Sequence, residues 1–404
     1  MKIIQVNKFN YLRGGAEKYF LAVTDELRRR GHDVAVFSMK HPKNLPSPWD
    51  KYFISRVSFN EGGLWNKIIG IGRTLYSFEA KRKFSKLVKD FKPDIIHVHN
   101  IYHHISPSIL TVARKHNIPV IMHLHDYKLI SPNYQLYSNN KVCYDGAAPN
   151  YFKCVSKKCF KDSYSASFLV ALEMFWHHKV LKIYEKNIKR YIAPSHFMKD
   201  TCVRFGVPAD MINVLYNFID AAPKLENTAG NYMLYFGRLS GEKGIDVLLR
   251  ALARLDKTTI LKIAGTGPDE EKLKALTKEL KLTKQVEFLG HLNGSDISDL
   301  IIKARAIIIP SVWLENMPFS LLESLAFGKV AIVSNIGGLA ELIKDGVNGF
   351  SYPAHDISSL AKKIESLEHA DLDKISQAAM ETVKDLRIDK HVDVLLKIYE
   401  MSKS

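Results

Sequence analysis

The chain has 404 residues, which is too long for one typical hydrophobic core and suits two α/β domains. Hydrophobic residues make up 46% and charged residues 25%, as in ordinary globular proteins. No apolar run reaches the roughly 18–20 residues that a bilayer crossing needs, and residues 1–6 resemble a short strand more than a signal peptide. These features predict a cytoplasmic protein without a transmembrane segment.

The formal net charge of +16 is unevenly distributed along the chain. Residues 1–225 hold 35 Lys and Arg against 17 Asp and Glu, whereas residues 226–404 hold 23 against 25. A basic half of this kind attracts nucleic acid, anionic lipid or a phosphorylated substrate.

In chain order, the first half alternates short apolar runs with helical patterns. A helix is predicted at Gly14–Arg30, and near-continuous apolar runs are typical of strands that are buried on both faces. Strands separated by helices imply βαβ units and a parallel sheet. The predicted strands are Ile3–Asn7, Asp33–Ser38, Asp94–His99, Val120–His125, Lys189–Pro194 and Ile212–Tyr216.

The same alternation restarts in the second half, after a polar segment with Pro223 and Gly230 that predicts a linker at Asp220–Asn231. A helix is predicted at Ile245–Leu255, and the tail from about Asp385 has a helical pattern. The fold class is therefore α/β with two Rossmann-like domains. The predicted strands are Tyr232–Phe236, Ile260–Ala264, Gln285–Leu289, Ala306–Ile309 and Val330–Ser334.

The turns after the strands of the second half carry residues suited to a phosphate group, and ligands of doubly wound sheets lie at the carboxyl ends of strands. Gly237–Gly244 places Arg238 and Lys243 in a glycine-bearing turn, where a planar fork and a compact charge could neutralise a diphosphate. Small residues at Gly265-Thr266-Gly267 would let a nucleotide approach the backbone. The last such turn is Asn335–Glu341, which could also be a simple connection.

The third turn, Ser311–Glu323, carries two carboxylates around a helix start. Pro318 suits the first helical position, so that the backbone amides of Met317–Ser320 would form an anion site. Glu315 before the helix and Glu323 inside it suit recognition of hydroxyl groups, one on a ribose and one on a sugar.

With these motifs, nearly the whole chain resembles the retaining glycosyltransferases of family 4, which have the GT-B fold. The most specific match is Glu315…Glu323, spaced as the family's E-x7-E motif, followed by Arg238 and Lys243. The glycine loop Gly14–Glu17 and the pair His125-Asp126 match two further features of the family.

The resemblance implies a function and a role for each matched position. The protein would move a sugar from a nucleotide sugar, by default a UDP-sugar, to a glycan or polyprenyl-diphosphate-linked acceptor in cell-surface polysaccharide synthesis. The catalytic residues would be His125, Arg238, Lys243 and Glu315. Donor binding would involve Gly14, Gly15, Gly237, Arg238, Lys243, Gly265, His291, Leu292, Glu315, Asn316, Met317, Pro318, Phe319, Ser320 and Glu323.

Within that set, Arg238 and Lys243 would stabilise the departing diphosphate, and Gly15 would let the first domain's backbone approach it. Glu323 would bind the ribose and Glu315 the transferred sugar, with His125 beside the sugar's hydroxymethyl region. The nucleobase would lie near Gly265 and the backbone of His291-Leu292.

No divalent metal is expected, because two cations and a helix N-terminus could stabilise the leaving group and the sequence lacks an Asp-x-Asp motif. No carboxylate is placed as a covalent nucleophile, so a front-face transfer is the working hypothesis. The family's domains would be 1–220 for the acceptor and 221–385 for the donor, with 386–404 as a helix returning to the first domain.

Two basic segments of the first domain, each rich in aromatic residues, suggest an anionic membrane surface as a partner. Gly63–Phe91 contains Trp65, Ile68, Ile69 and Ile71 and ends near Lys81-Arg82-Lys83, and Ser165–Arg190 contains Phe168, Phe175 and Trp176. The expected location is cytoplasmic and peripheral, on the inner face of the cytoplasmic membrane. The alternative for these residues is ordinary packing of helices on the sheet.

Three of the four cysteines, Cys143, Cys154 and Cys159, fall within 17 residues. Three thiolates could bind a structural zinc with a fourth ligand, although Gly146 stands where some relatives have a fourth cysteine. The alternative is an ordered loop with reduced thiols.

Other functions stay open at this stage. A nucleotide-sugar epimerase or a glycogen-type phosphorylase would share the fold, although no pyridoxal-lysine signature is present. An inactive carbohydrate-binding subunit is a further alternative. A nucleic-acid-binding protein would fit a pI of about 9.4 but lacks any recognition motif, so no nucleic-acid partner is expected.

Overall fold

The computed structural model describes residues 1–56, 70, 72–219, 230–292 and 294–403. The chain forms two compact units. The first comprises Met1–Leu136, Cys143–Tyr216 and Ile388–Ser404, and the second comprises Tyr137–Val142 and Asn217–Arg387. The predicted linker falls almost wholly on residues outside the described ranges, and the predicted boundaries after residues 220 and 385 stay predictions.

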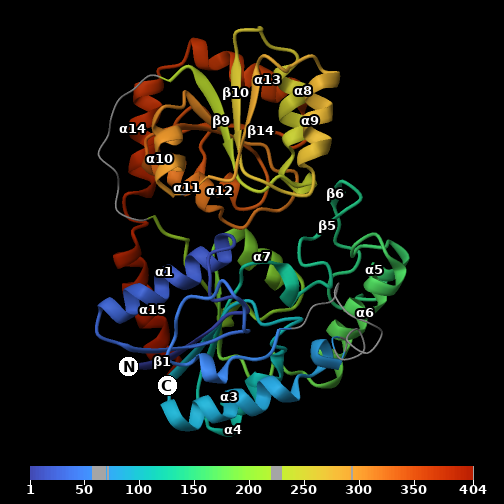
Figure 1. The fold of residues 1–404 in the computed structure, drawn as a ribbon, viewed down its shortest axis with the longest axis vertical. Helices are drawn as coiled ribbons and strands as arrows, with labels where there is room; N and C mark the ends of the chain where they lie inside the picture. Colours follow the sequence, from blue (N-terminus) through green and yellow to red (C-terminus); the bar gives the residue numbers. More distant parts are fainter. Residues whose placement is uncertain (57–69, 71, 220–229, 293, 404) are drawn as a thin grey trace. The chain divides into compact units, whose positions relative to one another are not determined.

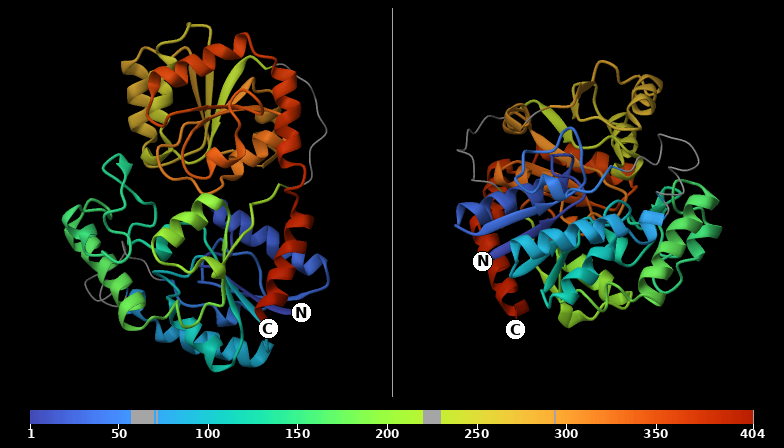
Figure 2. Two further views of the ribbon diagram at one scale, coloured as in Figure 1. Left: turned by 180° about the vertical axis from the view of Figure 1, so that it is seen from behind. Right: turned by 60° about the horizontal axis from the view of Figure 1, so that its bottom comes forward.

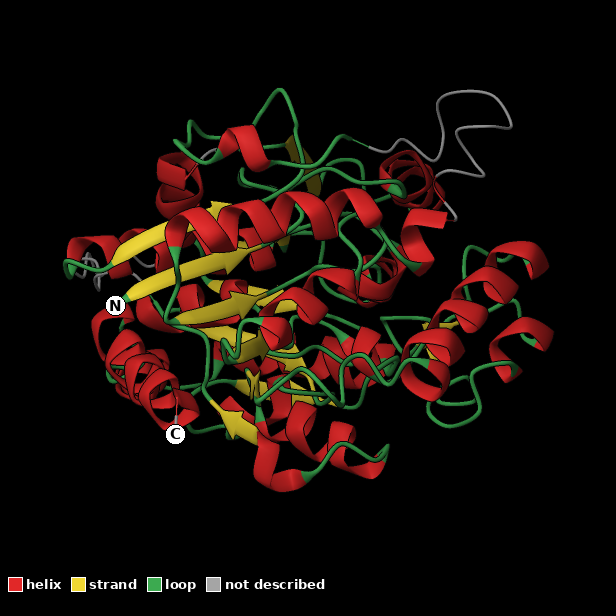
Figure 3. Cartoon of the chain, turned by 90° about the horizontal axis from the view of Figure 1, so that it is seen from below, coloured by secondary structure: helices red, strands yellow, loops and turns green. Residues whose placement is uncertain are grey.

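The first unit is built on a six-stranded sheet in the order β2-β1-β3-β4-β7-β8, with every described pair of neighbours parallel. Figure 3 shows strands of the molecule as yellow arrows, with helices over their faces. The strands are β1 (Lys2–Val6), β2 (Asp33–Phe37), β3 (Ile95–Val98), β4 (Val120–His123), β7 (Arg190–Ala193) and β8 (Ile212–Val214).

Three helices of the first unit begin at a serine N-cap. The side chains of Ser77, Ser163 and Ser195 accept hydrogen bonds from the backbone at the starts of α3, α6 and α7. The helices are α1 (Gly15–Arg29), α3 (Phe78–Phe91), α4 (Leu110–Lys115), α5 (Lys153–Ser156), α6 (Tyr164–Phe175), α7 (His196–Arg204) and α15 (Ile388–Lys403). Short 3-10 turns are η1 (Asp50–Tyr52), η2 (Pro107–Ile109), η3 (Tyr127–Leu129) and η5 (Ala209–Met211), and η4 (Trp176–Val180) is a π-helical turn after α6.

The C-terminal helix α15 belongs to the same unit as the N-terminus and packs beside α1 (Figures 1 and 2). Its Tyr399 is fully buried, and the Tyr399 hydroxyl accepts a hydrogen bond from the amide of Gln5 on β1. Leu395 and Ile398 of the same helix are also buried. The last residues of the chain thus complete the core around the first strand.

The second unit repeats the plan with the strand order β11-β10-β9-β12-β13-β14, again parallel throughout the described pairs. The strands are β9 (Tyr232–Phe236), β10 (Ile260–Ala264), β11 (Val286–Gly290), β12 (Ala306–Ile309), β13 (Val330–Ser334) and β14 (Phe350–Tyr352). The helices are α8 (Ile245–Leu252), α9 (Glu270–Glu279), α10 (Gly294–Ile302), α11 (Phe319–Ala326), α12 (Leu339–Leu342), α13 (Ile357–Glu365) and α14 (Leu372–Val383), with 3-10 turns η6 (Gly241–Lys243) and η7 (Ser366–Glu368).

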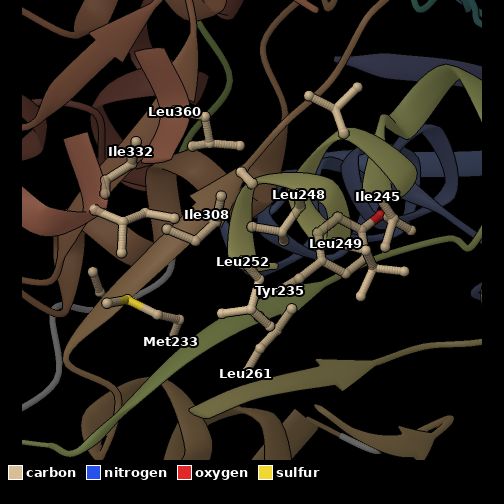
Figure 4. Packing of buried hydrophobic residues seen from close by; sticks show 14 of the residues in the cluster. Met233, Tyr235, Ile245, Leu248, Leu249, Leu252, Leu261, Ile308, Ile332 and Leu360 are labelled. Atoms are coloured by element: carbon tan, nitrogen blue, oxygen red, sulfur yellow. The ribbon is translucent and has the colours of Figure 1, made fainter. Parts of the chain in front are cut away.

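The core of the second unit lies between the sheet and the helices α8 and α13. Leu248 and Leu249 of α8 and Leu360 of α13 are fully or almost fully buried against Ile308 and Ile332 of the sheet (Figure 4). Burying an aliphatic side chain of this size stabilises a fold by about 1.5–3 kcal/mol relative to leaving it exposed. This packing fixes the carboxyl ends of β9 and β12, from which the candidate site is built.

The two-Rossmann prediction is confirmed, and two smaller elements escaped it. The short strand β14 extends the second sheet beyond β13, which the sequence suggested as the last long strand. A hairpin of β5 (Tyr137–Ser138) and β6 (Lys141–Val142) interrupts the chain after β4 and is grouped with the second unit.

Among the described residues, no helix combines the length and the apolar character that crossing a bilayer requires.

Candidate functional site

In the second unit, the order of the strands reverses between β9 and β12, which lie side by side although β10 and β11 come between them in the sequence. Ligands of such sheets bind outside the carboxyl ends of the strands at this switch point. The turn Gly237–Gly244 follows β9, and the segment beginning at Pro310 follows β12. Two of the four predicted motifs therefore meet at the place where the topology favours a ligand.

Lys243 and Glu315 form the centre of this site. Lys243 Nζ lies 2.7 Å from Glu315 Oε1, and the Ser311 hydroxyl donates to the same oxygen at 2.6 Å. Lys243 also lies over the ring of Trp313, with Nζ 5.2 Å from the ring centroid. Glu315 is buried and Lys243 is largely buried, so their charges interact more strongly than those of a surface pair.

The backbone holds these two segments close together. The amide of Val312 donates to the carbonyl of Glu242 at 3.0 Å, which joins the turn after β9 to the segment after β12. Gly244 has a φ of +66°, and a Cβ there would lie 2.0 Å from the carbonyl oxygen of Pro310. Only glycine allows this approach, so Lys243 reaches Glu315 because the next residue has no side chain.

A second pair of glycines, in the turn after β13, contacts the backbone of Glu315. The amide of Gly338 donates to the Glu315 carbonyl at 2.6 Å. A Cβ on Gly337, whose φ is +61°, would lie 2.3 Å from the same oxygen. The fourth predicted motif, the turn after β13, thus supports the backbone of Glu315.

The glycines after β10 have a packing role that the sequence did not reveal. A Cβ on Gly265 would lie 1.9 Å from the Gly237 carbonyl oxygen, and one on Gly267 would lie 2.1 Å from that of Leu239. The neighbouring backbone therefore lies on the side of each glycine where a Cβ would stand. Tight backbone packing by itself explains why these positions are glycine.

The start of α11 differs from its prediction by one residue. Pro318 has ψ of 136° and precedes the helix, which begins at Phe319, so Pro318 is the N-cap and not the first helical residue. Its carbonyl accepts hydrogen bonds from Leu321 and Leu322. Met317 and Asn316 are buried, and the Asn217 side chain donates to the Met317 carbonyl at 2.8 Å.

The other predicted residues of the second unit lie on neighbouring elements or loops of the same unit. Glu323 lies on α11 and is partly exposed, Arg238 is exposed, and His291 and Leu292 follow β11. No role for Ser311, Trp313 or Asn217 was predicted from the sequence. Ser311 and Trp313 stand within the quoted motif, whereas nothing in the sequence marked Asn217.

In the first unit, Gly14 is the N-cap of α1 and Gly15 its first residue. His125 and Asp126 follow β4, and the Asp126 carboxylate accepts from the Lys128 amide at 2.9 Å, which caps η3. Burial raises the pKa of Asp126 to about 6 and lowers the pKa of His125 to about 3. His125 is therefore neutral near pH 7.

His125 belongs to a group of stacked aromatic rings. Its ring centroid lies 4.4 Å from that of His123 and 5.2 Å from that of His99. In both pairs the angle between the two ring planes is 27°. The buried Tyr19 of α1 packs edge-on against His125, with centroids 5.4 Å apart. The sequence analysis named only His125 of this group.

Lys8, which follows β1 at the switch point of the first sheet, was also not named. Its Nζ lies 4.9 Å from the ring centroid of Tyr102, and its amide donates to the Asn100 carbonyl. Burial lowers the pKa of Lys8, and the charges of Asp126 and Glu17 oppose this shift. These three charged residues make the carboxyl end of the first sheet a polar site.

The structure gives no support to the zinc hypothesis for Cys143, Cys154 and Cys159. Cys154 and Cys159 are buried with Val170, and Cys143 packs against them. Even so, the described residues include no group of three His, Cys, Asp or Glu placed to hold a metal ion. A Cβ on Gly146 would lie only 2.8 Å from the Cβ of Cys154, so a cysteine at position 146 would not fit without a shift of its neighbours.

Comparisons with known proteins agree with the fold and with the predicted family. Residues 13–222 match the model "Glycosyltransferase Family 4", and residues 218–384 match "Glycosyl transferases group 1". A protein from the cps region of Klebsiella pneumoniae is 29% identical over 383 residues, covering 90% of this chain and 94% of that protein. A glycogen synthase of Mycobacterium tuberculosis is 25% identical, covering 88% and 82%.

Among solved structures, Anabaena HepE in complex with UDP has the same fold, with a TM-score of 0.70 and 18% identity. The match covers 99% of this chain and 100% of that one.

Proposed function

The chain belongs to glycosyltransferase family 4, and we propose that it transfers a sugar from a UDP-sugar, with retention of configuration, to a glycan or polyprenyl-diphosphate-linked acceptor in polysaccharide synthesis. The observation that carries the proposal is the contact of Lys243 with Glu315 at the switch point of the second sheet. It places a cation beside a carboxylate in a largely buried site.

The chemistry of the transfer explains why such a pair is useful. As the bond between C1 of the sugar and the diphosphate breaks, negative charge grows on the phosphate oxygens, and prepositioned cations stabilise that charge. Lys243 and Arg238 take this role, and the backbone N–H groups of Met317, Phe319 and Ser320 at the start of α11 support it. No protein carboxylate attacks the sugar in this scheme. The acceptor hydroxyl approaches C1 from the face that the diphosphate leaves and passes its proton to the departing diphosphate oxygen.

The two glutamates bind hydroxyl groups. Glu315 is held by Lys243 and Ser311, so its second oxygen and its fixed orientation suit the hydroxyls of the transferred sugar. Glu323, one turn into α11, binds the ribose. The base lies by Gly265, His291 and Leu292, Gly14 and Gly15 contact the diphosphate through their backbone, and His125 contacts the sugar.

The choice of UDP is supported by the relative that was solved with UDP, and a thermal-shift screen of UDP, GDP and their sugars tests it. A larger stabilisation by GDP would replace UDP as the donor nucleotide. Anomeric NMR signals of the product formed from an α-linked UDP-sugar test retention, and a β-linked product would show inversion.

The central test removes the cations. Lys243→Ala and Arg238→Ala should each weaken UDP binding by about ten- to a hundredfold, because hydrogen bonds between charged groups contribute about 1.5–3 kcal/mol. Isothermal titration calorimetry with UDP measures this. Lys262→Ala is the matched control, because Lys262 lies on the same unit and its Nζ is 3.5 Å from Oε2 of Glu287. This variant should bind UDP as tightly as the wild type. Unchanged UDP affinity and turnover in the Lys243 and Arg238 double variant would refute the proposal.

We propose that the protein binds an anionic membrane surface through the region of α5 and α6, and that it meets its acceptor there. Their exposed aromatic side chains touch one another, since the ring of Phe152 lies 6.1 Å from that of Phe168 and 5.8 Å from that of Phe175. Trp176 and Val180 of the adjoining η4 are also exposed, and exposed lysines lie on or near these elements in the sequence. These lysines are Lys153, Lys157, Lys161, Lys179 and Lys182.

Exposed aromatic rings among cations are typical of proteins that bind the interface of a bilayer, because the rings enter the headgroup region and the cations meet anionic lipid. The other basic segment offers less support. Trp65, Ile68, Ile69 and Ile71 lie outside the described residues, and Lys83 is engaged with Glu79 and the Phe53 carbonyl.

Phe168→Ser combined with Trp176→Ser should abolish flotation with phosphatidylglycerol vesicles, and wild type should not float with phosphatidylcholine vesicles. Phe78→Ser is the control. Phe78 is 76% exposed, but it belongs to α3, which is far in the sequence from α5 and α6. Flotation that is lost in Phe78→Ser and kept in the double variant would place the membrane surface on α3 instead.

A further inference from the structure

A chain of buried side chains connects His125 to the first strand and the last helix of the first unit. His125 Nε2 lies 2.9 Å from Nδ1 of His99, and His99 Nε2 lies 2.8 Å from Oε1 of Gln5. The Gln5 amide donates to the Tyr399 hydroxyl at 3.3 Å, and that hydroxyl lies 2.7 Å from Nδ1 of His97. Gln5, His97, His99 and Tyr399 are all fully buried.

The amide of Gln5 gives this chain a direction. Its carbonyl oxygen can only accept, so His99 must carry a proton on Nε2. Burial lowers the pKa of His99 well below 6.5, so the ring is neutral and has one proton. Its Nδ1 is then an acceptor, and the hydrogen bond to His125 requires the proton to be on Nε2 of His125.

The far end of the chain agrees with this direction. Gln5 donates to the oxygen of Tyr399, so the Tyr399 hydroxyl is left to donate its own proton to His97 Nδ1 at 2.7 Å when that nitrogen carries no proton. The hydroxyl proton of the buried Tyr19 is likewise donated to a histidine. His391 Nδ1 lies 2.9 Å from the Tyr216 carbonyl and must donate, so His391 Nε2 accepts from the Tyr19 hydroxyl at 2.8 Å.

We propose that Gln5 is a positioning residue that acts through His99 to fix the tautomer of His125, so that Nδ1 of His125 accepts a hydrogen bond from a hydroxyl group of the transferred sugar. The proposal rests on the proposed function, in which His125 contacts that sugar. It assigns His125 as an acceptor rather than a donor, and it gives Gln5, a residue far from the donor motifs in the sequence, a defined effect on the reaction.

The first test reads the tautomer directly in the unliganded full-length protein. Protein labelled with ¹⁵N in its histidine rings is compared with the His125→Asn variant to assign His125, and long-range ¹H–¹⁵N spectra show which ring nitrogen carries the proton. The expected result is a proton on Nε2. A proton on Nδ1 overturns the proposal, and this readout needs neither substrate nor turnover.

The second test removes the acceptor. Gln5→Met keeps the length of the side chain but takes away the oxygen that holds the proton on His99, so the His125 signals should shift toward a mixture of tautomers. With UDP-glucose, UDP-galactose or UDP-N-acetylglucosamine, whichever turns over, kcat should fall about tenfold while the Kd for UDP stays unchanged. An unchanged His125 spectrum in Gln5→Met overturns the proposal.

Gln285→Met is the matched control. Gln285 is also a buried glutamine, its amide donates to the carbonyls of Asp256 and Thr259, and it belongs to the second unit. Its loss should reduce stability without altering the His125 spectrum. If no UDP-sugar turns over and UDP does not bind, the proposed function fails while the spectra still decide the tautomer.

Discussion

At the residue scale, glycines determine whether the proposed donor site can form. Gly337 and Gly346 both have positive φ, +61° and +72°, so alanine at either position meets the same backbone strain. They differ in their surroundings, since a Cβ on Gly337 would lie 2.3 Å from the Glu315 carbonyl oxygen and one on Gly346 would meet nothing within 4 Å. The pair therefore separates backbone strain from displacement of Glu315.

We expect Gly337→Ala to weaken UDP-sugar binding at least tenfold, because the Glu315 backbone must move away. Gly346→Ala should lower the thermal midpoint through strain of about 1–2 kcal/mol and leave the affinity unchanged. Titration calorimetry and thermal unfolding of both variants measure the two effects. Equal affinities would show that the position of the Glu315 backbone is unimportant for binding.

At the scale of elements, a buried ion pair ties the helix α6 to the short helix η3 that follows His125 and Asp126. Lys128 Nζ lies 2.8 Å from Glu173 Oε2, and both side chains are almost completely buried. Burial opposes the charge on Glu173, but Lys128, with the nearby His103 and His177, keeps the pKa of Glu173 below its usual range. The pair fixes the base of the loop that carries His125.

Removing one partner should cost far more than removing both. Glu173→Leu leaves Lys128 buried without its counter-charge and should destabilise the first unit by about 3–5 kcal/mol. Adding Lys128→Met should restore part of this loss, because no charge then remains uncompensated. Urea unfolding of the single and double variants measures the difference, and a double variant less stable than Glu173→Leu would contradict this account.

Some elements could be predicted from the sequence, and others could not. Long apolar runs such as Ala306–Ile309 and Val330–Ser334 were predicted as strands, since burial on both faces requires such runs. The three residues of β14 show no periodicity of their own and form a strand only by pairing with β13. The short hairpin of β5 and β6 is likewise made by pairing rather than by local preference.

At the scale of the whole molecule, the buried histidines predict instability in acid. Burial lowers the pKa of His97 and His125 to about 3 and of His391 to about 4, against 6.5 for an exposed histidine. Between these values the unfolded chain binds more protons than the folded one, so stability falls as pH decreases. Asp126 acts in the opposite sense, because its pKa is raised to about 6 and its contribution is lost as pH rises.

The histidines outnumber this carboxyl group, so we expect the thermal midpoint to fall steadily from about pH 6.5 to pH 4. His97→Asn should flatten this dependence, because one buried group no longer takes up a proton on unfolding. Calorimetry at a series of pH values measures the slope, with the exposed His116→Asn as the control. A thermal midpoint that is constant over this range would contradict the prediction.

The sequence by itself determined the two α/β domains, the family and most of the donor motifs, because apolar runs and the spacing of Arg238, Lys243, Glu315 and Glu323 are local properties of the chain. Tertiary structure decided which residues meet. Lys243 reaches Glu315 across 72 positions because β9 and β12 are neighbours, and Gln5 reaches Tyr399 across 394 because α15 packs against the first sheet. Contacts of this kind depend on strand order and helix docking, which no local pattern encodes.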